Sequence, residues 1–349
     1  VLLSGGIHAG EIDGKDAGFL LLRQLLEGKL SPGLLGRVTF VFVPVFNVDG
    51  HERFGPNHRP NQNGPEQLGW RVTSQNLNLN RDWMKADAPE MGAMLKLLLK
   101  YDPILFGDLH ATDGAKFQHD LAVMLEPRFG ANAELNALGL ELSEALMKQL
   151  GELGHLPLDF YPSFEKDDEP LSGFGYGIPP PRFSHVYWSA RHRFGVLVET
   201  HSWKDYASRV KATVDVSLLM LEQAAAKGPQ WRKAAQAAEA ADLKLGGEEV
   251  ALAWDSGKAA RPFDFQGYAF TQEDSAVSGK KWVRYDDTTP KVWKEQLLTE
   301  VIPVLKARLP RAGWVVMPGQ ARLVAEKLTA HGFKLEPLAR GGARAALQA

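Results

Sequence analysis

The sequence predicts an α/β fold with a mixed, largely parallel twisted sheet and helices on both faces. Two observations predict it. Short apolar runs are followed closely by His or carboxylate residues, and amphipathic helical patterns separate these runs. The chain has 349 residues and 44% hydrophobic content, enough for a full catalytic core and a smaller appended unit.

The apolar runs are too short for helices and are typical of buried strands. They lie at residues 1–3, 38–43, 104–106 and 196–198. The run at 38–43 is rich in β-branched residues and ends at Pro44, before the turn sequence Asn47-Val48-Asp49-Gly50. Helical patterns are expected at 13–27, 89–100 and 133–150.

An alanine-rich helix is expected at 228–242, and beyond it the pattern changes to short alternating runs. We therefore predict a larger domain at 1–242 and a small α+β accessory domain at 243–349. Within the second unit, strands are expected near 249–254, 282–285 and 313–317, and helices near 290–307 and 320–331. Because the chain begins inside an apolar run at Val1, we expect N-terminal strands to be missing.

Charge and composition restrict the classes of partner. Lys plus Arg is 40 against 42 for Asp plus Glu, so no net basic field favours nucleic acid or an anionic membrane surface. No apolar stretch reaches the roughly 18–20 residues of a spanning helix. A small or peptide-like substrate fits better. The oligomeric state is not predicted, and the compartment stays open, with a periplasmic or secreted location as one alternative if a signal peptide was removed.

The first chemical motif is Ser4-Gly5-Gly6-Ile7-His8-Ala9-Gly10-Glu11, which places His8 and Glu11 three positions apart just after a strand. The chain has no cysteine, so a metal would need His, Asp or Glu ligands. His110 also follows an apolar strand, and ligands at strand carboxyl ends are expected in an open α/β sheet. The three residues together predict a single zinc ion. The alternative is a pair of loop residues that cap the next helix.

Two further segments carry groups suited to a peptide substrate. Asn80 and Arg81 offer an amide and a planar guanidinium that can hold a carboxylate, and Arg71 could face a second oxyanion. Taken alone, this segment also fits a solvated loop. Glu199 ends the strand at 196–198, where a carboxylate can act as a general base beside a metal. Its alternative role is to pair with Arg191 or Arg193.

Taken together, these residues resemble the zinc carboxypeptidases of the carboxypeptidase A type. That family has the order His-x-x-Glu, Arg, Asn-Arg, His and Glu, and the same order occurs here within residues 1–225. The resemblance implies that His8, Glu11 and His110 bind zinc and that Glu199 is the general base. It also implies that Arg71 polarises the scissile carbonyl while Asn80 and Arg81 hold the terminal carboxylate. The unit at 243–349 is similar to small C-terminal units of some bacterial relatives.

Two details of the resemblance are less direct. The family has a tyrosine before the base that closes over the substrate, and Tyr176 and Tyr187 both stand at suitable distances, with Tyr176 preferred. Relatives also carry an aspartate two positions before the Asn-Arg pair, where this chain has Asn78. The change removes a negative charge that supports a zinc-binding histidine, so we expect weaker zinc affinity or a more acidic bound water.

The expected function is hydrolysis of the C-terminal peptide bond of peptides by a zinc metallocarboxypeptidase. One alternative is an amidase or deacylase that acts on acyl amino acids or cell-wall peptides. A long cleft would favour the peptidase, and a C-terminal unit that caps a narrow pocket would favour the deacylase. The other alternative is a binding module without catalytic activity.

Overall fold

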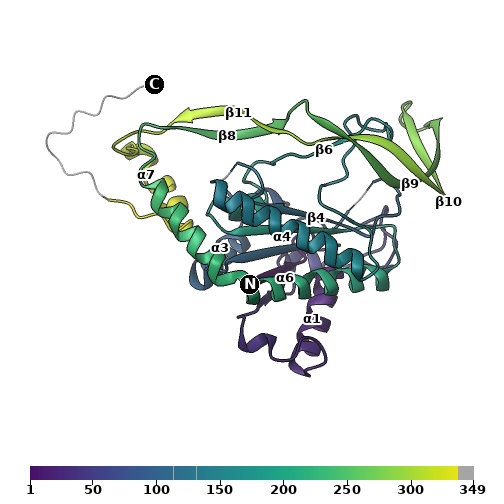
Figure 1. Ribbon diagram of the computed structural model, residues 1–349, viewed down its shortest axis with the longest axis horizontal. Helices are drawn as coiled ribbons and strands as arrows, with labels where there is room; N and C mark the ends of the chain where they lie inside the picture. The colour runs from purple at the N-terminus through teal and green to yellow at the C-terminus, as the bar shows by residue number, and fades with distance from the viewer. Residues whose placement is uncertain (113, 131, 337–349) are drawn as a thin grey trace.

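A computed structural model describes residues 1–112, 114–130 and 132–336. Its main sheet has six strands in the order β2–β1–β3–β7–β4–β5 (Figure 1). These strands are β1 (Leu2–Gly5), β2 (Val41–Val43), β3 (Leu105–Ala111), β4 (Leu121–Glu126), β5 (Pro157–Leu158) and β7 (Phe194–Thr200). All neighbouring pairs are parallel except β4 with β7. The predicted mixed, largely parallel sheet is therefore confirmed.

Helices cover both faces of this sheet. Their bounds are α1 (Asp13–Leu26), α2 (Val48–Glu52), α3 (Pro89–Tyr101), α4 (Ala133–Glu152), α5 (Ser184–Ser189), α6 (Tyr206–Asp242) and α7 (Pro318–Ala330). Helices α1, α4 and α6 share one hydrophobic cluster with the sheet, and α3 and α5 share the other. Successive residues of β1 separate the two faces, because Leu2 packs into the second cluster and Leu3 into the first. In the described part of the chain, no helix is both long and apolar enough to cross a bilayer.

The sheet brings the predicted functional segments to one edge. Parallel strands β1, β3 and β7 all end there, and the turn that follows β1 carries His8 and Glu11. His110 of β3 pairs in register with Glu199 of β7. Both strands are buried along their whole length, which fixes these polar side chains at the rim of a rigid core.

The C-terminal part forms long antiparallel ribbons, drawn in green and yellow above the sheet in Figure 1. Strand β9 (Ala260–Asp274) pairs with β10 (Lys281–Leu298), and β8 (Glu249–Ser256) pairs with β11 (Val301–Arg308). The short strand β6 (Phe174–Gly175) adds to β10. Through Phe265, Trp293 and Leu297, the ribbon joins a buried cluster with residues that precede position 243. The division of the chain after residue 242 stays a prediction.

The predicted helix at 290–307 is wrong, because β10 and β11 occupy this segment. Trp293, Glu295 and Leu297 are buried and their immediate neighbours are exposed or only partly buried, which is the two-residue period of a strand. No strand forms at 313–317, although the helix expected near 320–331 is present as α7. The alanine-rich helix at 228–242 is the last part of the longer helix α6.

Candidate metal and substrate site

His8, Glu11 and His110 form a compact buried cluster. Nδ1 of His8 lies 3.0 Å from Oε1 of Glu11, and Nδ1 of His110 lies 2.8 Å from Oε2 of the same carboxylate. A tight turn, in which the Glu11 N–H donates to the His8 carbonyl, brings the first two together. The possible ligand atoms of all three residues lie within 4.8 Å of one another.

This donor set fits zinc. Two imidazoles and one carboxylate are the ligands of a common class of catalytic zinc sites, which keep a further position open for water or substrate. All three side chains are nearly inaccessible to solvent, with 2–4% exposure, so the ion would be bound in a preformed site. The set would hold one ion, as predicted.

The charges within the cluster favour an ionised Glu11. Burial alone would raise the pKa of Glu11, but His8, Arg59 and His110 outweigh burial and lower this pKa well below its usual value. Burial also opposes the charged form of His110, yet Asp108 and Glu11 raise its pKa well above the usual range. The pKa of His8 is lowered, chiefly by burial.

Two contacts of this cluster were missed by the sequence analysis. Arg59 is buried, and its Nη2 lies 2.9 Å from Oε1 of Glu11. Asp108 is also buried, with Oδ2 3.1 Å from Nε2 of His110. Arg59 stands in an irregular Gly-rich segment that gives no local signal. Asp108 could have been found, because it precedes His110 by two positions on a strand and such residues share a face.

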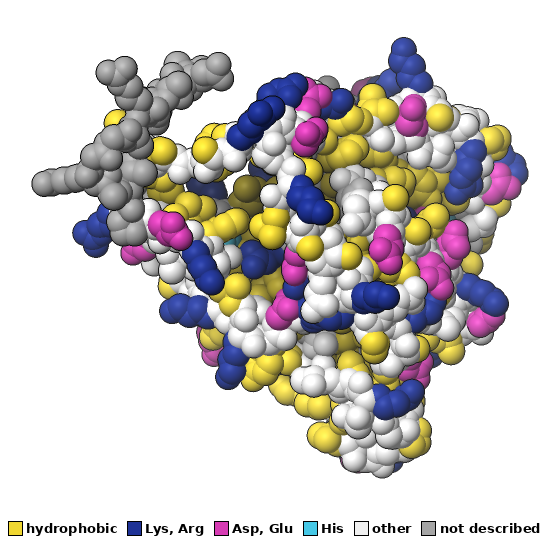
Figure 2. Space-filling model, turned by 60° about the vertical axis from the view of Figure 1, so that its left-hand side comes forward, with side chains coloured by type: hydrophobic (Ala, Val, Ile, Leu, Met, Phe, Trp, Pro, Cys, Tyr) yellow, Lys and Arg dark blue, Asp and Glu magenta, His cyan; other side chains and the backbone are white. Residues whose placement is uncertain are grey.

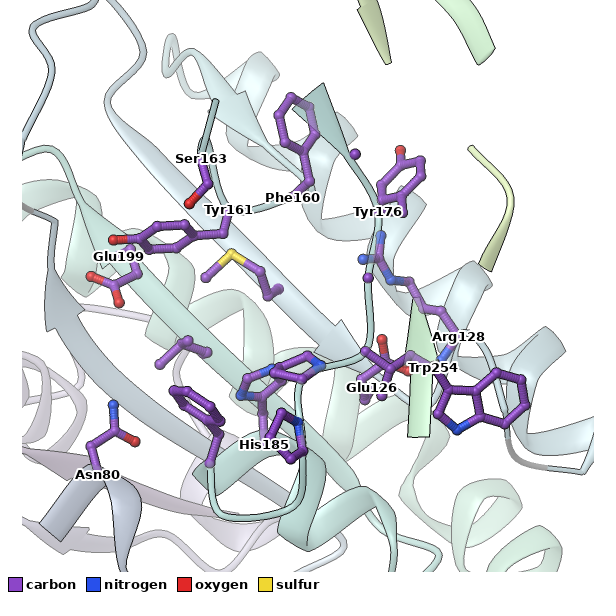
Figure 3. Close-up of a pocket in the computed structure, with 18 of the residues that line it drawn as sticks. Asn80, Glu126, Arg128, Phe160, Tyr161, Ser163, Tyr176, His185, Glu199 and Trp254 are labelled. Atoms are coloured by element: carbon purple, nitrogen blue, oxygen red, sulfur yellow. Dashed lines mark hydrogen bonds between the residues drawn. The ribbon is translucent and has the colours of Figure 1, made fainter. Parts of the chain in front are cut away.

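A cavity of about 580 Å³ opens beside the metal cluster (Figure 3). It combines charged residues near the cluster with aromatic and aliphatic walls. Its lining comprises His8, Arg71, Asn80, Arg81, Met124, Glu126, Arg128, Phe160, Tyr161, Ser163, Gly175, Tyr176, Gly177, Ile178, Pro179, Pro180, Phe183, His185, Leu197, Glu199, Trp254 and Asp255. The cavity thus brings one metal ligand together with the predicted residues Arg71, Asn80, Arg81 and Glu199.

Glu199 and Tyr161 lie at the same end of the cavity in Figure 3. Glu199 is at the end of β7 and is only 8% exposed. Tyr161 was not singled out from the sequence, because it lies in an irregular segment between β5 and β6 with no motif around it. Its position makes it a further candidate for contact with a substrate.

Asn80 and Arg81 belong to a short 3₁₀ turn, Leu79–Arg81. The guanidinium of Arg81 lies 4.2 Å from the centre of the Phe183 ring and donates to the Asn80 carbonyl at 2.7 Å. Burial, with Arg182 and Arg71 nearby, lowers the pKa of Arg81. Oδ1 of Asn80 is buried and has no hydrogen-bond partner among the described residues. A buried amide oxygen without a partner at a cavity wall is suited to accept a hydrogen bond from a ligand.

Arg71 also reaches the cluster, with Nη1 3.6 Å from Oε1 of Glu11. Its backbone is held by Asn47, whose side-chain amide donates to the Arg71 carbonyl at 3.2 Å. The Gly50 and Trp70 backbones pair closely, and a Cβ on Gly50 would lie 2.3 Å from the Trp70 carbonyl oxygen. The turn at 47–50 therefore holds the backbone of Trp70 and Arg71 in place.

The two candidate tyrosines lie in different places. Tyr176 lines the cavity, and its hydroxyl donates to Oδ2 of Asp159 at 2.6 Å. Burial and Asp159 raise the pKa of Tyr176 to about 12. Tyr187 is not among the residues of the cavity wall. It is buried in the cluster with α3, and its hydroxyl lies 2.8 Å from Nδ1 of His331. We therefore leave Tyr187 out of the proposed substrate site.

The end of the cavity away from Asn80 contains Glu126, Arg128 and Trp254 (Figure 3). Nη1 of Arg128 pairs with Asp159 at 3.2 Å. Glu126 accepts the N–H groups of Arg128 and Phe129. Burial raises the pKa of Glu126 to about 7. This end of the cavity therefore holds a carboxyl group that is partly protonated near neutral pH.

This shift predicts a pH-dependent stability difference for Glu126→Gln. A folded-state pKa of about 7 against a usual value of 4.5 means that Glu126 favours folding below pH 4.5, and that this contribution is lost as the pH rises through 7. Its full size is roughly 3 kcal/mol. The free energy of unfolding of Glu126→Gln minus that of the parent protein should therefore increase between pH 4.5 and 8 in urea titrations. The exposed control Glu66→Gln should show a flat difference, and a flat difference for Glu126→Gln would refute the shift.

Comparison with known proteins shows that part of the chain matches a known family. Residues 1–117 match the family model described as zinc carboxypeptidase. No curated protein matches the sequence. Solved structures that match include a protein assigned as a metallopeptidase from Shewanella denitrificans, with 17% identity, a TM-score of 0.41, and coverage of 64% of this chain and 74% of that one.

Two matching structures are metallo-carboxypeptidases from Burkholderia cenocepacia and Pseudomonas aeruginosa. Both are 15% identical, with TM-scores of 0.45 and 0.44, and the match covers 63% and 64% of this chain. This chain spans 56% of the length of each. Likeness at this level carries no argument about activity. The zinc carboxypeptidase model matches the N-terminal part of the chain, residues 1–117, and the cluster of His8, Glu11 and His110 lies within this match.

Proposed function

We propose that this protein hydrolyses the C-terminal peptide bond of peptides or small peptide-like substrates. The observation that carries the proposal is the cavity itself. Its lining includes Glu199, Arg71, the Asn80–Arg81 pair and His8 of the metal cluster, which supports the proposal. On the face shown in Figure 2, acidic and basic side chains are interspersed, which fits a small substrate in a cavity better than a long polyanion.

Asn80 and Arg81 are proposed to hold the terminal carboxylate. A guanidinium can donate two parallel hydrogen bonds to a carboxylate, and the amide of Asn80 adds a donor beside it. Stacking on Phe183 limits the rotation of the Arg81 head group, so less entropy is lost when it binds. A substrate fixed in this way presents its last peptide bond to the remaining residues, and internal bonds do not reach them.

Glu199 and Arg71 are proposed to carry out the proton transfer and charge stabilisation. When bound by His8, Glu11 and His110, zinc would acidify a water molecule and polarise the scissile carbonyl. Glu199 takes a proton from the attacking water and later donates it to the leaving amine. Arg71 directs its guanidinium towards the carbonyl oxygen and stabilises the negative charge that develops there.

A specific observation favours a second candidate, an amidase or deacylase that acts on acyl amino acids. Trp254 and Asp255 of β8 line the cavity, so the C-terminal segment closes part of it. A volume of about 580 Å³ is that of a pocket for a small ligand rather than of a long cleft. In this reading, Asn80 and Arg81 would still bind a free carboxylate, now that of the acylated amino acid.

The test is hydrolysis of matched substrates by the zinc-loaded protein. The panel contains short peptides with free and amidated C-termini, together with N-acyl amino acids. Cleavage of the free peptides alone supports the carboxypeptidase, and cleavage of acyl amino acids alone supports the deacylase. If zinc is bound and none of the panel is cleaved, the proposed activity is rejected in favour of a binding module.

Replacing Arg81 with alanine tests the carboxylate site. The loss of a charge-assisted hydrogen bond, about 1.5–3 kcal/mol, should lower kcat/KM for the free peptides by roughly 10- to 150-fold, mainly through KM. Arg182→Ala is the matched control, because this neighbouring arginine is exposed and is not part of the cavity wall. Equal kcat/KM values for Arg81→Ala and the parent protein would exclude the proposed role.

A further inference from the structure

Asp108 is a buried carboxylate that the proposed reaction does not use. It lies in the middle of β3, is 1% exposed, and shares a strand face with His110. Neither carboxylate oxygen has a hydrogen-bond partner within the described residues. In the same part of the chain, His110 is the only basic side chain that pairs with Asp108, with Oδ2 and Nε2 3.1 Å apart.

Such a carboxylate is costly to bury, since an uncompensated buried ion costs several kcal/mol. Nearby His185 does not compensate it, because burial lowers the pKa of His185 to about 4 and leaves the ring neutral at pH 7. The position of Asp108 therefore depends on His110. Nε2 of His110 and Oδ2 of Asp108 are within hydrogen-bond distance, although the ring N–H does not point directly at the oxygen.

The other histidine of the proposed zinc site, His8, has an amide rather than a carboxylate beside its Nε2 atom. Nε2 of His8 lies 3.3 Å from Oδ1 of Asn78. The same oxygen accepts the backbone N–H of Asn80 at 3.0 Å, so the amide is already engaged in the local turn. Both histidines thus direct Nδ1 to Glu11 and Nε2 to a supporting residue. The support of His8 is neutral, whereas that of His110 is a carboxylate.

We propose that Asp108 is a positioning residue that holds the His110 ring and supplies the carboxylate support that Asn78 lacks. A carboxylate on Nε2 fixes the tautomer in which Nδ1 is free to bind zinc, and it makes that nitrogen a better donor. Because the support acts through His110, Asp108 itself contacts neither zinc nor substrate. In this chain the negative charge therefore lies beside His110, and a neutral amide lies beside His8.

The experiment measures zinc affinity by competition with a chromophoric chelator, without any peptide substrate. Failure of this inference is thus distinguishable from failure of the proposed hydrolysis. Asp108→Asn should weaken zinc binding by about 10- to 100-fold, the usual cost of losing such a partner. The double variant Asn78→Asp with Asp108→Asn moves the carboxylate to His8 and should bind zinc more tightly than Asp108→Asn alone.

Asp82→Asn is the matched control. Asp82 is also a buried carboxylate, but it accepts the N–H groups of Asp87 and Ala88 at the start of α3 and does not contact the metal cluster. Its replacement should lower the unfolding temperature and leave zinc affinity unchanged. Parent-like affinity in Asp108→Asn, or an equal loss in Asp82→Asn, would overturn the proposal.

A measurement on the parent protein keeps the proposal open to refutation if Asp108→Asn does not fold. In NMR spectra of the zinc-loaded protein, the His110 ring proton on Nε2 should resonate further downfield than that of His8, because Nε2 of His110 faces a carboxylate oxygen at 3.1 Å and Nε2 of His8 faces an amide oxygen at 3.3 Å. The opposite order of these two protons would also overturn the proposal.

Discussion

Glu199→Gln is expected to lower turnover by roughly 10²- to 10⁴-fold, the usual contribution of a general base. Glutamine keeps the size of the side chain and its place at the end of β7, but it cannot take a proton from water. KM should change little, because Asn80 and Arg81 would still hold the terminal carboxylate. Steady-state kinetics on a free-terminus peptide measure both constants.

The zinc content of Glu199→Gln shows whether the loss of turnover comes from the missing base or from a loss of the metal. Glu199 lies outside the group of possible metal ligands, so Glu199→Gln should retain one zinc per chain by elemental analysis. Glu144→Gln is the control, because this glutamate is exposed on α4 and lies away from the cavity. Turnover close to that of the parent protein in Glu199→Gln would remove Glu199 from the mechanism.

The main sheet and its functional edge could be predicted from the sequence because their signals are local and strong. Runs at 1–3, 104–106 and 196–198 are apolar and too short for helices, and each is followed closely by His or a carboxylate. Since parallel strands end at one edge, the positions of His8 and His110 after strands predict that they converge, and the resemblance to the zinc carboxypeptidases adds Glu199 to this group. The structure brings these residues together at that edge.

Strand β4 was missed because its residues favour a helix rather than a strand. The segment Leu121–Glu126 contains Leu, Ala, Met and Glu, which favour helices, and it is buried on both faces, so no alternation marks it as a strand. It becomes a strand because β7 offers an antiparallel partner. Such pairing depends on the whole fold and leaves no local signal.

The prediction at 290–307 failed because the period of two appears only in the burial of the side chains. Trp293, Glu295 and Leu297 are buried and alternate with residues that are exposed or partly buried, but the buried Glu295 is polar, so the sequence itself does not alternate between apolar and polar residues. Arg59 is different again. Its contact with Glu11 joins two loops that are 48 positions apart, which only the folded chain brings together.

His110→Ala should nearly abolish zinc binding, with a loss larger than the about 10- to 100-fold expected for removal of a supporting partner. Two ligands remain, and within the described residues the buried carboxylate of Asp108 loses the only basic side chain that pairs with it. Zinc that binds only the folded state stabilises it by about 2.7 kcal/mol at 100 times Kd, so the parent protein should melt at a higher temperature when zinc is added. His110→Ala should lose this shift, whereas His119→Ala, a buried histidine outside the cluster, should keep it. A zinc-dependent shift that persists in His110→Ala would show that the ion is held elsewhere.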